Sequence, residues 1–486
     1  MRPFGALVFG RLGDLVGRKY TFLITIVIMG GATFAVGILP TSDTIGIAAP
    51  IILIILRMLQ GLALGGEYGG AATYVAEHAP NGRRGFYTSF IQVTATAGLF
   101  LSLLVILFTR LAVGEEAFTA WGWRIPFLIS VVLLGISVWI RLQMEESPAF
   151  QRMKAAGTQS KAPLSEAFGQ WKNAKIALFA LLGLVMGQAV VWYTGQFYVL
   201  FFLGAVLKVD TFTQNMLVAW SLILGSGGFI FFGWLSDKIG RKPIILSGCL
   251  IAALTYFPLF HLLSEEANPA LARAHATIEV RVVTDPALCS FQFNPTGTAR
   301  FTQPCDIAKA ALARASVNYA VETAPAGTAA TIRIANGTPI QVAGNATFAA
   351  DLTRALTTAG YPSASNPSVV KMSNPFDIFR TQPAVLIGIL TLMVIYVTMV
   401  YGPIAAALVE LFPTRIRYTS MSLPYHIGNG WFGGLMPATA FAMIAQTGDV
   451  YYGLWYPVVI ALACVVIGLF FVPETYKRDL FADERK

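Results

Sequence analysis

The sequence predicts an all-α protein that crosses a membrane many times and carries a small extramembrane insertion. Of its 486 residues, 56% are hydrophobic and 12% are charged, whereas a soluble domain has roughly 25% charged residues. Ten apolar stretches are long enough to cross a ~30 Å hydrocarbon core, which needs roughly 20 residues each. A ten-residue charged pattern also occurs twice after an apolar run, as GRLGDLVGRK at 10–19 and GWLSDKIGRK at 233–242. This repeat indicates a duplicated bundle of helices.

The apolar stretches follow one another along the chain after the first copy of the pattern. They cover residues 20–39, 48–76, 86–111, 123–142, 174–205, 214–236, 243–262, 381–411, 419–446 and 451–472. Gly402-Pro403 lies inside one stretch, where we expect a kink. An apolar stub at 3–10 precedes the first copy. About 60 residues with two spans precede the second copy and nine residues precede the first, so we expect the chain to lack its first membrane helix and most of its second.

Basic residues gather in alternate connectors, which predicts the orientation of the chain. The connectors of this set contain Arg11, Arg18, Lys19, Arg83, Arg84, Arg152, Lys154, Lys161, Lys172, Lys238, Arg241, Lys242, Arg415 and Arg417. Because cytoplasmic loops carry the excess of Lys and Arg, we expect these connectors in the cytoplasm. The same bias explains the net charge of +9, so the sequence gives no reason to expect a nucleic-acid partner.

The segment 263–380 differs from the rest because it is poor in apolar runs. Strand-like pieces (Thr277–Thr284, Thr331–Ile334, Pro339–Val342) and helix-like pieces (Asp306–Ala315, Phe348–Ala359) predict a small α+β insertion outside the membrane. Cys289 and Cys305 both lie in this insertion, and the sequence allows either a disulfide between them or two free thiols. Cys249 and Cys464 lie inside spans and are expected to be buried apolar residues.

Within each copy of the charged pattern, an aspartate and an arginine stand four residues apart. On a continuous helix Asp14 would therefore pair with Arg18, and Asp237 with Arg241. A tight cytoplasmic hairpin with no further role would explain one copy, but two copies in matching places favour a gate. The gating pattern comprises Gly10, Asp14, Gly17, Arg18, Lys19, Gly233, Asp237, Gly240, Arg241 and Lys242.

The paired loops resemble the cytoplasmic signature of the major facilitator superfamily. Four segments (57–70, 121–127, 146–150 and 410–417) resemble its metabolite:proton symporter branch, whose members carry proline/betaine, α-ketoglutarate, shikimate or citrate. The resemblance implies two bundles working by alternating access in a plasma membrane, here a bacterial inner membrane, as a monomer. The expected parts are a truncated N-terminal bundle (1–142), a cytoplasmic linker (143–173), helices 7–9 (174–262), a periplasmic insertion (263–380), helices 10–12 (381–473) and a cytoplasmic tail (474–486).

Polar residues inside one span suggest where chemistry occurs. At about 100° per residue, Arg57, Gln60 and Glu67 share one arc of a helix. Ionisable residues in a span cost roughly 2.5–3.5 kcal/mol and usually mark a cavity or a proton path. Glu67 is the candidate proton-coupling carboxylate, and Arg57 would bind a substrate carboxylate or tune Glu67. The alternative is that Arg57 reaches the outer surface and Glu67 forms a structural pair.

The C-terminal bundle offers further polar groups that would face this arc. They are Gln188, Trp192, Tyr193, Gln196, His426 and Asn429. Aromatic and amide groups suit an organic solute with polar ends, although aromatic residues also serve as membrane-interface anchors and His426 could be a packed histidine.

Motifs for catalysis are absent from the sequence, which contains no H-E-x-x-H, no G-x-x-x-x-G-K-[ST], no G-x-S-x-G and no zinc-spaced cysteines. We therefore expect no enzyme, no metal and no cofactor, and a proton gradient as the energy source. The alternatives to a transporter are a membrane sensor that uses the insertion and an inactive truncated transporter. The sequence does not identify the metabolite or decide whether it is an anion or a zwitterion. It also does not decide whether transport occurs by symport, uniport or exchange.

Overall fold

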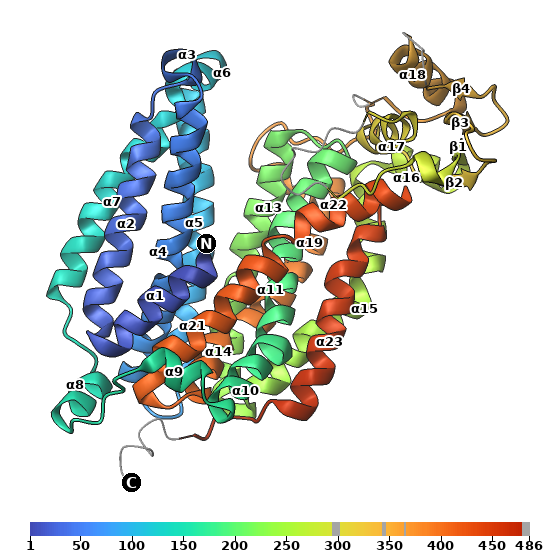
Figure 1. The fold of residues 1–486 in the computed structure, drawn as a ribbon. Coiled ribbons are helices and arrows are strands. Elements are labelled where there is room, and N and C mark those ends of the chain that lie inside the picture. The colour runs from blue at the N-terminus through green and yellow to red at the C-terminus, as the bar shows by residue number, and fades with distance from the viewer. Residues whose placement is uncertain (294–301, 343–346, 364–365, 479–486) are drawn as a thin grey trace.

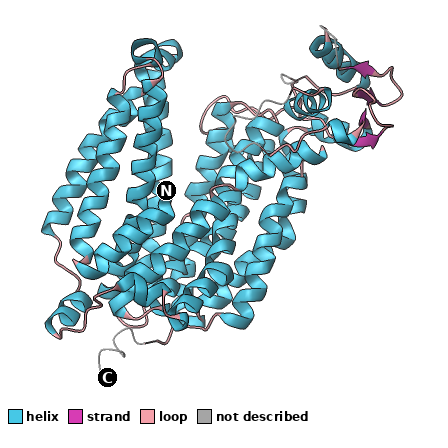
Figure 2. Cartoon of the chain, in the orientation of Figure 1, coloured by secondary structure: helices cyan, strands magenta, loops and turns pink. Residues whose placement is uncertain are grey.

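The computed structural model describes residues 1–293, 302–342, 347–363 and 366–478. Its helices form two bundles that meet at one end and diverge toward the other (Figure 1). All four strands lie in one small sheet that stands above the second bundle (Figure 2). Residues 479–486 of the expected tail lie outside the described part of the chain.

The first half consists of helices that pack through glycine-rich faces. Its helices are α1 (Arg2–Leu15), α2 (Arg18–Ile38), α3 (Ser42–Ile45), α4 (Ala48–His78), α5 (Arg84–Val113), α6 (Glu115–Ala117) and α7 (Arg124–Gln143). A Cβ built on Gly65 would lie 2.6 Å from the backbone nitrogen of Ala6, so the contact between α4 and α1 needs glycine there.

A linker with two short helices leads to the second half. The linker and the second half contain α8 (Pro148–Ala155), α9 (Pro163–Phe168), α10 (Trp171–Ala180), α11 (Met186–Tyr193), α12 (Val199–Phe201), α13 (Thr211–Gly225), α14 (Gly227–Ile239), α15 (Arg241–Ala267), α19 (Thr381–Tyr401), α20 (Ile404–Leu411), α21 (Arg417–Ile427), α22 (Met436–Thr447) and α23 (Trp455–Phe471). The break between α19 and α20 falls on Gly402-Pro403, as predicted.

Nine helices in the described residues are long and apolar enough to cross a membrane, where the sequence predicted ten. The stretch 419–446 is the predicted span that is not among these nine; it is helical but contains polar residues such as His426 and Asn429, so its crossing of the membrane stays a prediction. A π-helical segment, Gly428–Gly433, separates α21 from α22. Gly428 lies at the start of this segment, where a Cβ would lie 2.5 Å from Val185 Cγ1, so the segment packs closely against Val185.

The described residues of the insertion form a four-stranded sheet and three α-helices, which confirms a small α+β unit. Its elements are α16 (Pro269–Thr277), β1 (Val280–Thr284), α17 (Pro304–Arg314), β2 (Ala320–Thr323), β3 (Thr331–Ile334), β4 (Ile340–Gln341) and α18 (Phe348–Ala359). The strand order is β2-β1-β3-β4, with β1 parallel to β2 and antiparallel to β3. The exposed strand β2 was not predicted. Cys289 and Cys305 form a disulfide, whereas Cys249 and Cys464 are free and buried.

Hydrogen bonds fasten the insertion to helix ends of the second half, and it lies at the end of this bundle opposite to the one where the two bundles meet (Figure 1). The Tyr319 backbone N–H donates to the Gly448 carbonyl at 2.9 Å, and the Met372 N–H donates to Thr213 Oγ1 at 2.9 Å. Lys208 Nζ donates to the Arg314 carbonyl at 2.9 Å. The insertion is therefore held by the loops around α13 and α22.

Candidate functional site

Two polar clusters join the halves at the end where they meet; their central ion pairs are buried, whereas Glu146 is half-buried and Glu474 is exposed. We call the first cluster Asp14, Arg18, Glu77, Glu146 and Arg417, and the second cluster Asp237, Arg241, Glu410, Glu474 and Arg84. Each cluster contains residues from both halves of the chain, so its hydrogen bonds and ion pairs link the two halves.

In the first cluster, an aspartate of α1 caps a helix of the other half. The Asp14 carboxylate accepts hydrogen bonds from the backbone N–H groups of Tyr418, at 3.3 Å, and Thr419, at 2.8 Å. These groups lie in the first turn of α21, where N–H groups have no partner within the helix and the helix dipole favours a negative charge. Asp14 thereby holds the start of α21 against α1.

Arginines and glutamates extend this cap into a buried ionic network. Arg18 lies 3.4 Å from Asp14 and 3.7 Å from Glu77, and Glu77 lies 3.0 Å from Arg417. The Glu146 carboxylate accepts from the backbone N–H groups of Arg18, at 3.1 Å, and Lys19, at 3.2 Å. The predicted pairing of Asp14 with Arg18 is present, with partners that the sequence analysis did not include.

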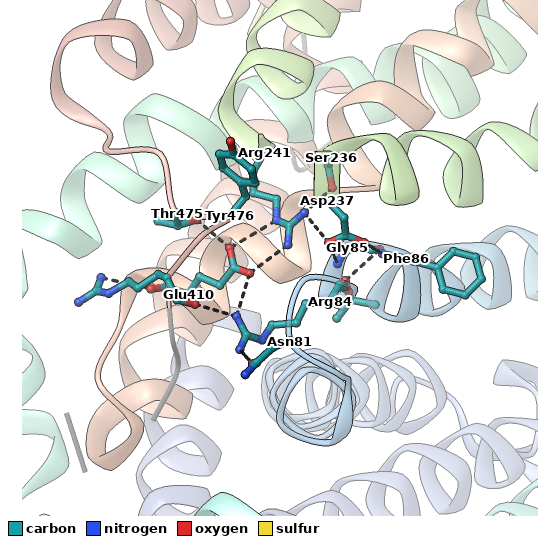
Figure 3. A network of polar contacts seen from close by, with 12 residues as sticks. Asn81, Arg84, Gly85, Phe86, Ser236, Asp237, Arg241, Glu410, Thr475 and Tyr476 are labelled. Atoms are coloured by element: carbon teal, nitrogen blue, oxygen red, sulfur yellow. Dashed lines mark hydrogen bonds and ion pairs between the residues drawn. The ribbon is translucent and has the colours of Figure 1, made fainter. Parts of the chain in front are cut away.

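The second cluster repeats this arrangement with the halves exchanged (Figure 3). The Asp237 carboxylate accepts from the backbone N–H groups of Gly85, at 2.9 Å, and Phe86, at 2.8 Å, in the first turn of α5. Arg241 lies 2.7 Å from Asp237 and 3.0 Å from Glu410. Glu410 lies 3.5 Å from Arg84.

Hydroxyl groups and a second helix cap complete the correspondence. Thr475 Oγ1 donates to Glu410 at 2.9 Å, and Ser147 Oγ donates to Glu77 at 2.5 Å. The Glu474 carboxylate accepts from the backbone N–H groups of Arg241, at 3.0 Å, and Lys242, at 2.9 Å, as Glu146 does at the start of α2. The two clusters are thus related by an approximate two-fold symmetry.

The glycines of the pattern allow these contacts. Gly17 and Gly240 have φ values of +133° and +108°, a region that residues with a Cβ seldom adopt. A Cβ on Gly10 would lie 3.0 Å from Thr419 Cα, and one on Gly233 would lie 2.5 Å from Ser89 Cβ. The close approach of the two halves therefore requires glycine at both positions.

Six cluster residues were not among the site residues predicted from the sequence, namely Glu77, Arg84, Glu146, Glu410, Arg417 and Glu474. The sequence does contain a repeated spacing that could have identified four of them. Arg84 follows Glu77 by seven residues, and Arg417 follows Glu410 by seven residues. Each glutamate pairs with the arginine of the other half, so the spacing is a second internal repeat.

The predicted polar arc of α4 is divided between two environments. Arg57 donates to Gln60 Oε1 at 3.0 Å, and Gln60 donates to Thr33 Oγ1 at 3.0 Å. Glu67 lies 3.8 Å from Arg141 on α7. The pair of Glu67 with Arg141 matches the alternative that the sequence left open, and Glu67 forms no ion pair with Arg57.

The predicted residues of the second half lie on α11, the π-helix Thr194–Tyr198, α21 and the π-helix Gly428–Gly433. Gln188 and Asn429 exchange two hydrogen bonds of 3.3 and 3.2 Å. Tyr193 packs against Gly433, because a Cβ there would lie 2.6 Å from its Cε2. Trp192 Nε1, Gln196 Nε2 and both ring nitrogens of His426 are buried and make no hydrogen bond to the residues that the structure describes.

Four polar residues between these helices were not predicted. The rings of Tyr68 and Tyr425, from opposite halves, stack with centroids 3.6 Å apart. Gln92 donates to Tyr68 Oη at 2.8 Å, and the hydroxyls of Tyr401 and Tyr425 lie 2.6 Å apart. The rings of Trp192 and His426, whose nitrogens have no partner among the described residues, lie next to this network, with centroids 5.8 Å from Tyr401 and 5.1 Å from Tyr425 respectively.

The chain belongs to the major facilitator superfamily. Residues 3–276, more than half of the chain, match the Major Facilitator Superfamily, and residues 368–485 match the description "Sugar (and other) transporter". Family membership confirms a multi-pass membrane protein that is not an enzyme. The solved structures of XylE mutants (TM-score 0.58, 16% identity, 99% of this chain and 85% of the other) and of FucP in the outward conformation (TM-score 0.53, 11% identity, 96% and 86%) share its fold.

Three Escherichia coli (strain K12) proteins illustrate the sequence similarity. The chain is 36% identical to the shikimate transporter over 270 residues, 37% identical to the proline/betaine transporter over 278 and 35% identical to the alpha-ketoglutarate permease over 280. These alignments cover 53, 54 and 56% of this chain and 59, 54 and 61% of the relatives. The chain thus spans less than two thirds of the length of these relatives.

Proposed function

We propose that this protein is a secondary active transporter that carries a small organic metabolite, a carboxylate or a zwitterion, together with protons across a bacterial inner membrane. The observation that carries the proposal is the pair of reciprocal clusters between the halves. The names of the similar proteins support a metabolite as substrate. The energy comes from the proton gradient and no bound cofactor takes part, and the protein works as a monomer.

Alternating access requires a closed end that can open. Both clusters lie beside the basic connectors, which supports a cytoplasmic location and therefore a state closed to the cytoplasm. A buried ionic network gives little net stability, because desolvation of the charges offsets their attraction. A two-fold pair of such networks can therefore hold the end shut and still release it when the halves rock.

The central polar groups are the proposed path for substrate and protons. Gln188, Trp192, Tyr193, Gln196, His426 and Asn429 would bind the metabolite from the second half. Arg57, Gln60 and Glu67 would act from α4, with Glu67 exchanging its partner Arg141 for a proton. Uptake by proteoliposomes tests the proposal: metabolites of the kinds named above should accumulate only under an inside-alkaline pH gradient, and a protonophore should abolish accumulation. Accumulation that ignores the gradient would contradict proton coupling.

Glu67→Gln is expected to abolish accumulation driven by a pH gradient and to leave exchange of substrate across the membrane at least partly active. Glutamine keeps the size of the side chain and can hydrogen bond but cannot carry a proton in this step. Both activities should be measured in the same proteoliposomes, with Glu116→Gln as the control because Glu116 is exposed. Unchanged pH-driven accumulation by Glu67→Gln would remove Glu67 from the coupling mechanism.

The insertion is proposed to lie in the periplasm, which thiol labelling can test. After mild reduction, the partly exposed Cys289 should react with a membrane-impermeant maleimide that reaches the periplasm but not the cytoplasm. A cysteine at the exposed Lys154 of the linker should react only after the inner membrane is permeabilised. The reverse pattern would place the insertion in the cytoplasm.

A further inference from the structure

A cavity of about 390 Å³ lies where the insertion rejoins the bundle, at the start of α19. Gln382 Nε2 donates to the Glu266 carbonyl at 2.6 Å, which fixes the start of α19 against the end of α15. The cavity has walls of proline and valine, and its polar lining residues are Lys371, Ser373, Arg380, Thr381 and Gln382. Its lining thus combines two cations with hydroxyl and amide groups and contains no carboxylate.

The two cations of this cavity have no ionic partner in the described part of the chain. Neither Lys371 nor Arg380 is among the residues that form ion pairs there. The acidic residue between them, Asp377, accepts hydrogen bonds from Ser373 Oγ, at 2.5 Å, and Asn374 Nδ2, at 2.8 Å, and so closes a turn of the segment itself. With two positive charges and one negative charge, the segment 371–380 has a net charge of +1.

The same segment runs along the first turns of α13, at the end of the bundle opposite to the two clusters. The Met372 backbone N–H donates to Thr213 Oγ1 at 2.9 Å, and Trp220 Nε1 donates to the Pro375 carbonyl at 2.7 Å. α13 and α14 form a candidate span of 29 residues, Thr211–Ile239, which measures about 43 Å at about 1.5 Å per residue. Because a whole bilayer is about 40–45 Å thick and its hydrocarbon core about 30 Å, we expect the first turns of α13 at the level of the lipid headgroups.

Two large apolar side chains are exposed at this level. Phe376 is 69% exposed and Phe379 is 89% exposed. The Phe376 ring contacts Trp220 edge to face, with centroids 6.2 Å apart, and Phe379 precedes by two residues the span that begins at Thr381. Exposed rings gain nothing from burial in water, whereas apolar side chains beside basic residues are typical of segments that lie in the bilayer interface.

We propose that this cavity and the two phenylalanines bind an anionic phospholipid in the leaflet on the insertion's side. The lipid phosphate binds Lys371 and Arg380, and its acyl chains pack against Phe376 and Phe379. A soluble phosphate compound would use the cations alone and leave both rings in water. The bound lipid gives the insertion a second attachment, to the membrane itself, which is independent of the substrate that the bundle carries.

Quenching of a fluorophore tests the depth of the segment. The full chain with Phe379→Cys is labelled with a nitrobenzoxadiazole maleimide without reductant, since the native cysteines are buried or paired. In nanodiscs, lipids that carry a nitroxide high on the acyl chain should quench this fluorophore strongly. The control is Ala326→Cys, because Ala326 is exposed between β2 and β3, in the sheet above the bundle (Figure 2). Weak quenching of the same size at both positions would overturn the proposal.

Lipid affinity tests the role of the two cations. Native mass spectrometry of the full chain in detergent, titrated with phosphatidylglycerol, gives the dissociation constant. A basic residue near an anionic lipid contributes about 1 kcal/mol, so Lys371→Gln and Arg380→Gln should each weaken binding about fivefold, and the double variant about 25-fold. Arg354→Gln is the matched control, since Arg354 is exposed on α18 and outside the lining. Affinity for phosphatidylcholine should be lower and the same in all variants.

A soluble analogue separates the lipid from a free phosphate. Glycerol 3-phosphate should not compete at the concentration of the lipid, because it lacks the acyl chains that Phe376 and Phe379 contact. If it bound as tightly as phosphatidylglycerol and lost affinity in the double variant, the lipid would be overturned as the ligand. The variant with Lys371→Arg and Arg380→Lys keeps both charges and should bind phosphatidylglycerol like the unmodified protein. Unchanged affinity for phosphatidylglycerol in the double glutamine variant, folded by size-exclusion chromatography, would also overturn the proposal.

Discussion

Glu410→Gln is expected to open the end of the protein that the two clusters hold closed. The substitution leaves Arg84 buried without a carboxylate partner and leaves Arg241 with Asp237 as its remaining carboxylate. Removal of one partner of a buried pair costs about 3–5 kcal/mol, and each 1.4 kcal/mol corresponds to a factor of ten in an equilibrium. The closed state should therefore lose about a hundredfold or more in population relative to the open state.

Pulsed electron paramagnetic resonance can measure this opening. Spin labels on cysteines at Tyr87 and Lys238, which are exposed near the start of α5 and the end of α14, report the separation of the halves. The native free cysteines, Cys249 and Cys464, are buried. Glu410→Gln should shift the distances to longer values. Glu115→Gln, which breaks the exposed pair with Arg110, should leave them unchanged because exposed pairs contribute little.

Glu77→Gln provides an internal comparison, because Glu77 holds the same place in the first cluster. Its substitution should produce a similar shift. A closed distance distribution in both glutamine variants would mean that the clusters do not hold this end shut.

Gly233→Leu is expected to prevent closure by a different physical cause. A Cβ at this position would lie 2.5 Å from Ser89 Cβ and 2.6 Å from the Gly85 carbonyl oxygen. Part of this contact is backbone, which cannot rotate away, so α14 and α5 must separate. Overpacking of this kind usually costs about 1–3 kcal/mol or more, and the open state relieves it.

The same pair of spin labels should therefore show longer distances for Gly233→Leu. Gly227→Leu is the matched control on α14, because a Cβ on Gly227 has nothing within 4 Å. Gly10→Leu should act like Gly233→Leu on the other side of the approximate symmetry axis. If Gly233→Leu and Gly227→Leu gave the same closed distances, close packing at Gly233 would not control the state of the protein.

Local features of the sequence predicted the helices well, because apolar length and glycine or proline content act within one segment. The kink at Gly402-Pro403 and the strand Thr331–Ile334 are examples. The π-helical segment after Ile427 was not predicted, because apolar length does not distinguish a π-helix from an α-helix; Gly428 at its start packs against Val185, a residue far away in the sequence. The exposed strand β2 was missed because its parallel partner β1 lies about forty residues earlier.

The candidate site was predicted where its chemistry follows the helix period and missed where it depends on how the halves meet. Asp14 with Arg18 is an i, i+4 pair and could be predicted. The pair of Glu77 with Arg417 joins residues 340 positions apart, and the stack of Tyr68 on Tyr425 requires the same docking of the halves. The repeated spacing of glutamate and arginine could have identified the first of these contacts, and the tyrosines gave no comparable signal.

The attachment of the insertion to the start of α13 and the end of α22 has a practical value for imaging. A bundle of helices inside a detergent micelle offers few features for aligning particles in electron cryomicroscopy. A folded unit held by the Tyr319 and Met372 backbone hydrogen bonds projects from one half (Figure 1) and can serve as a fiducial marker without an added fusion protein. Because it is fastened to the second half, its angle to α2 and α7 in each particle image would record the rocking state of that molecule directly.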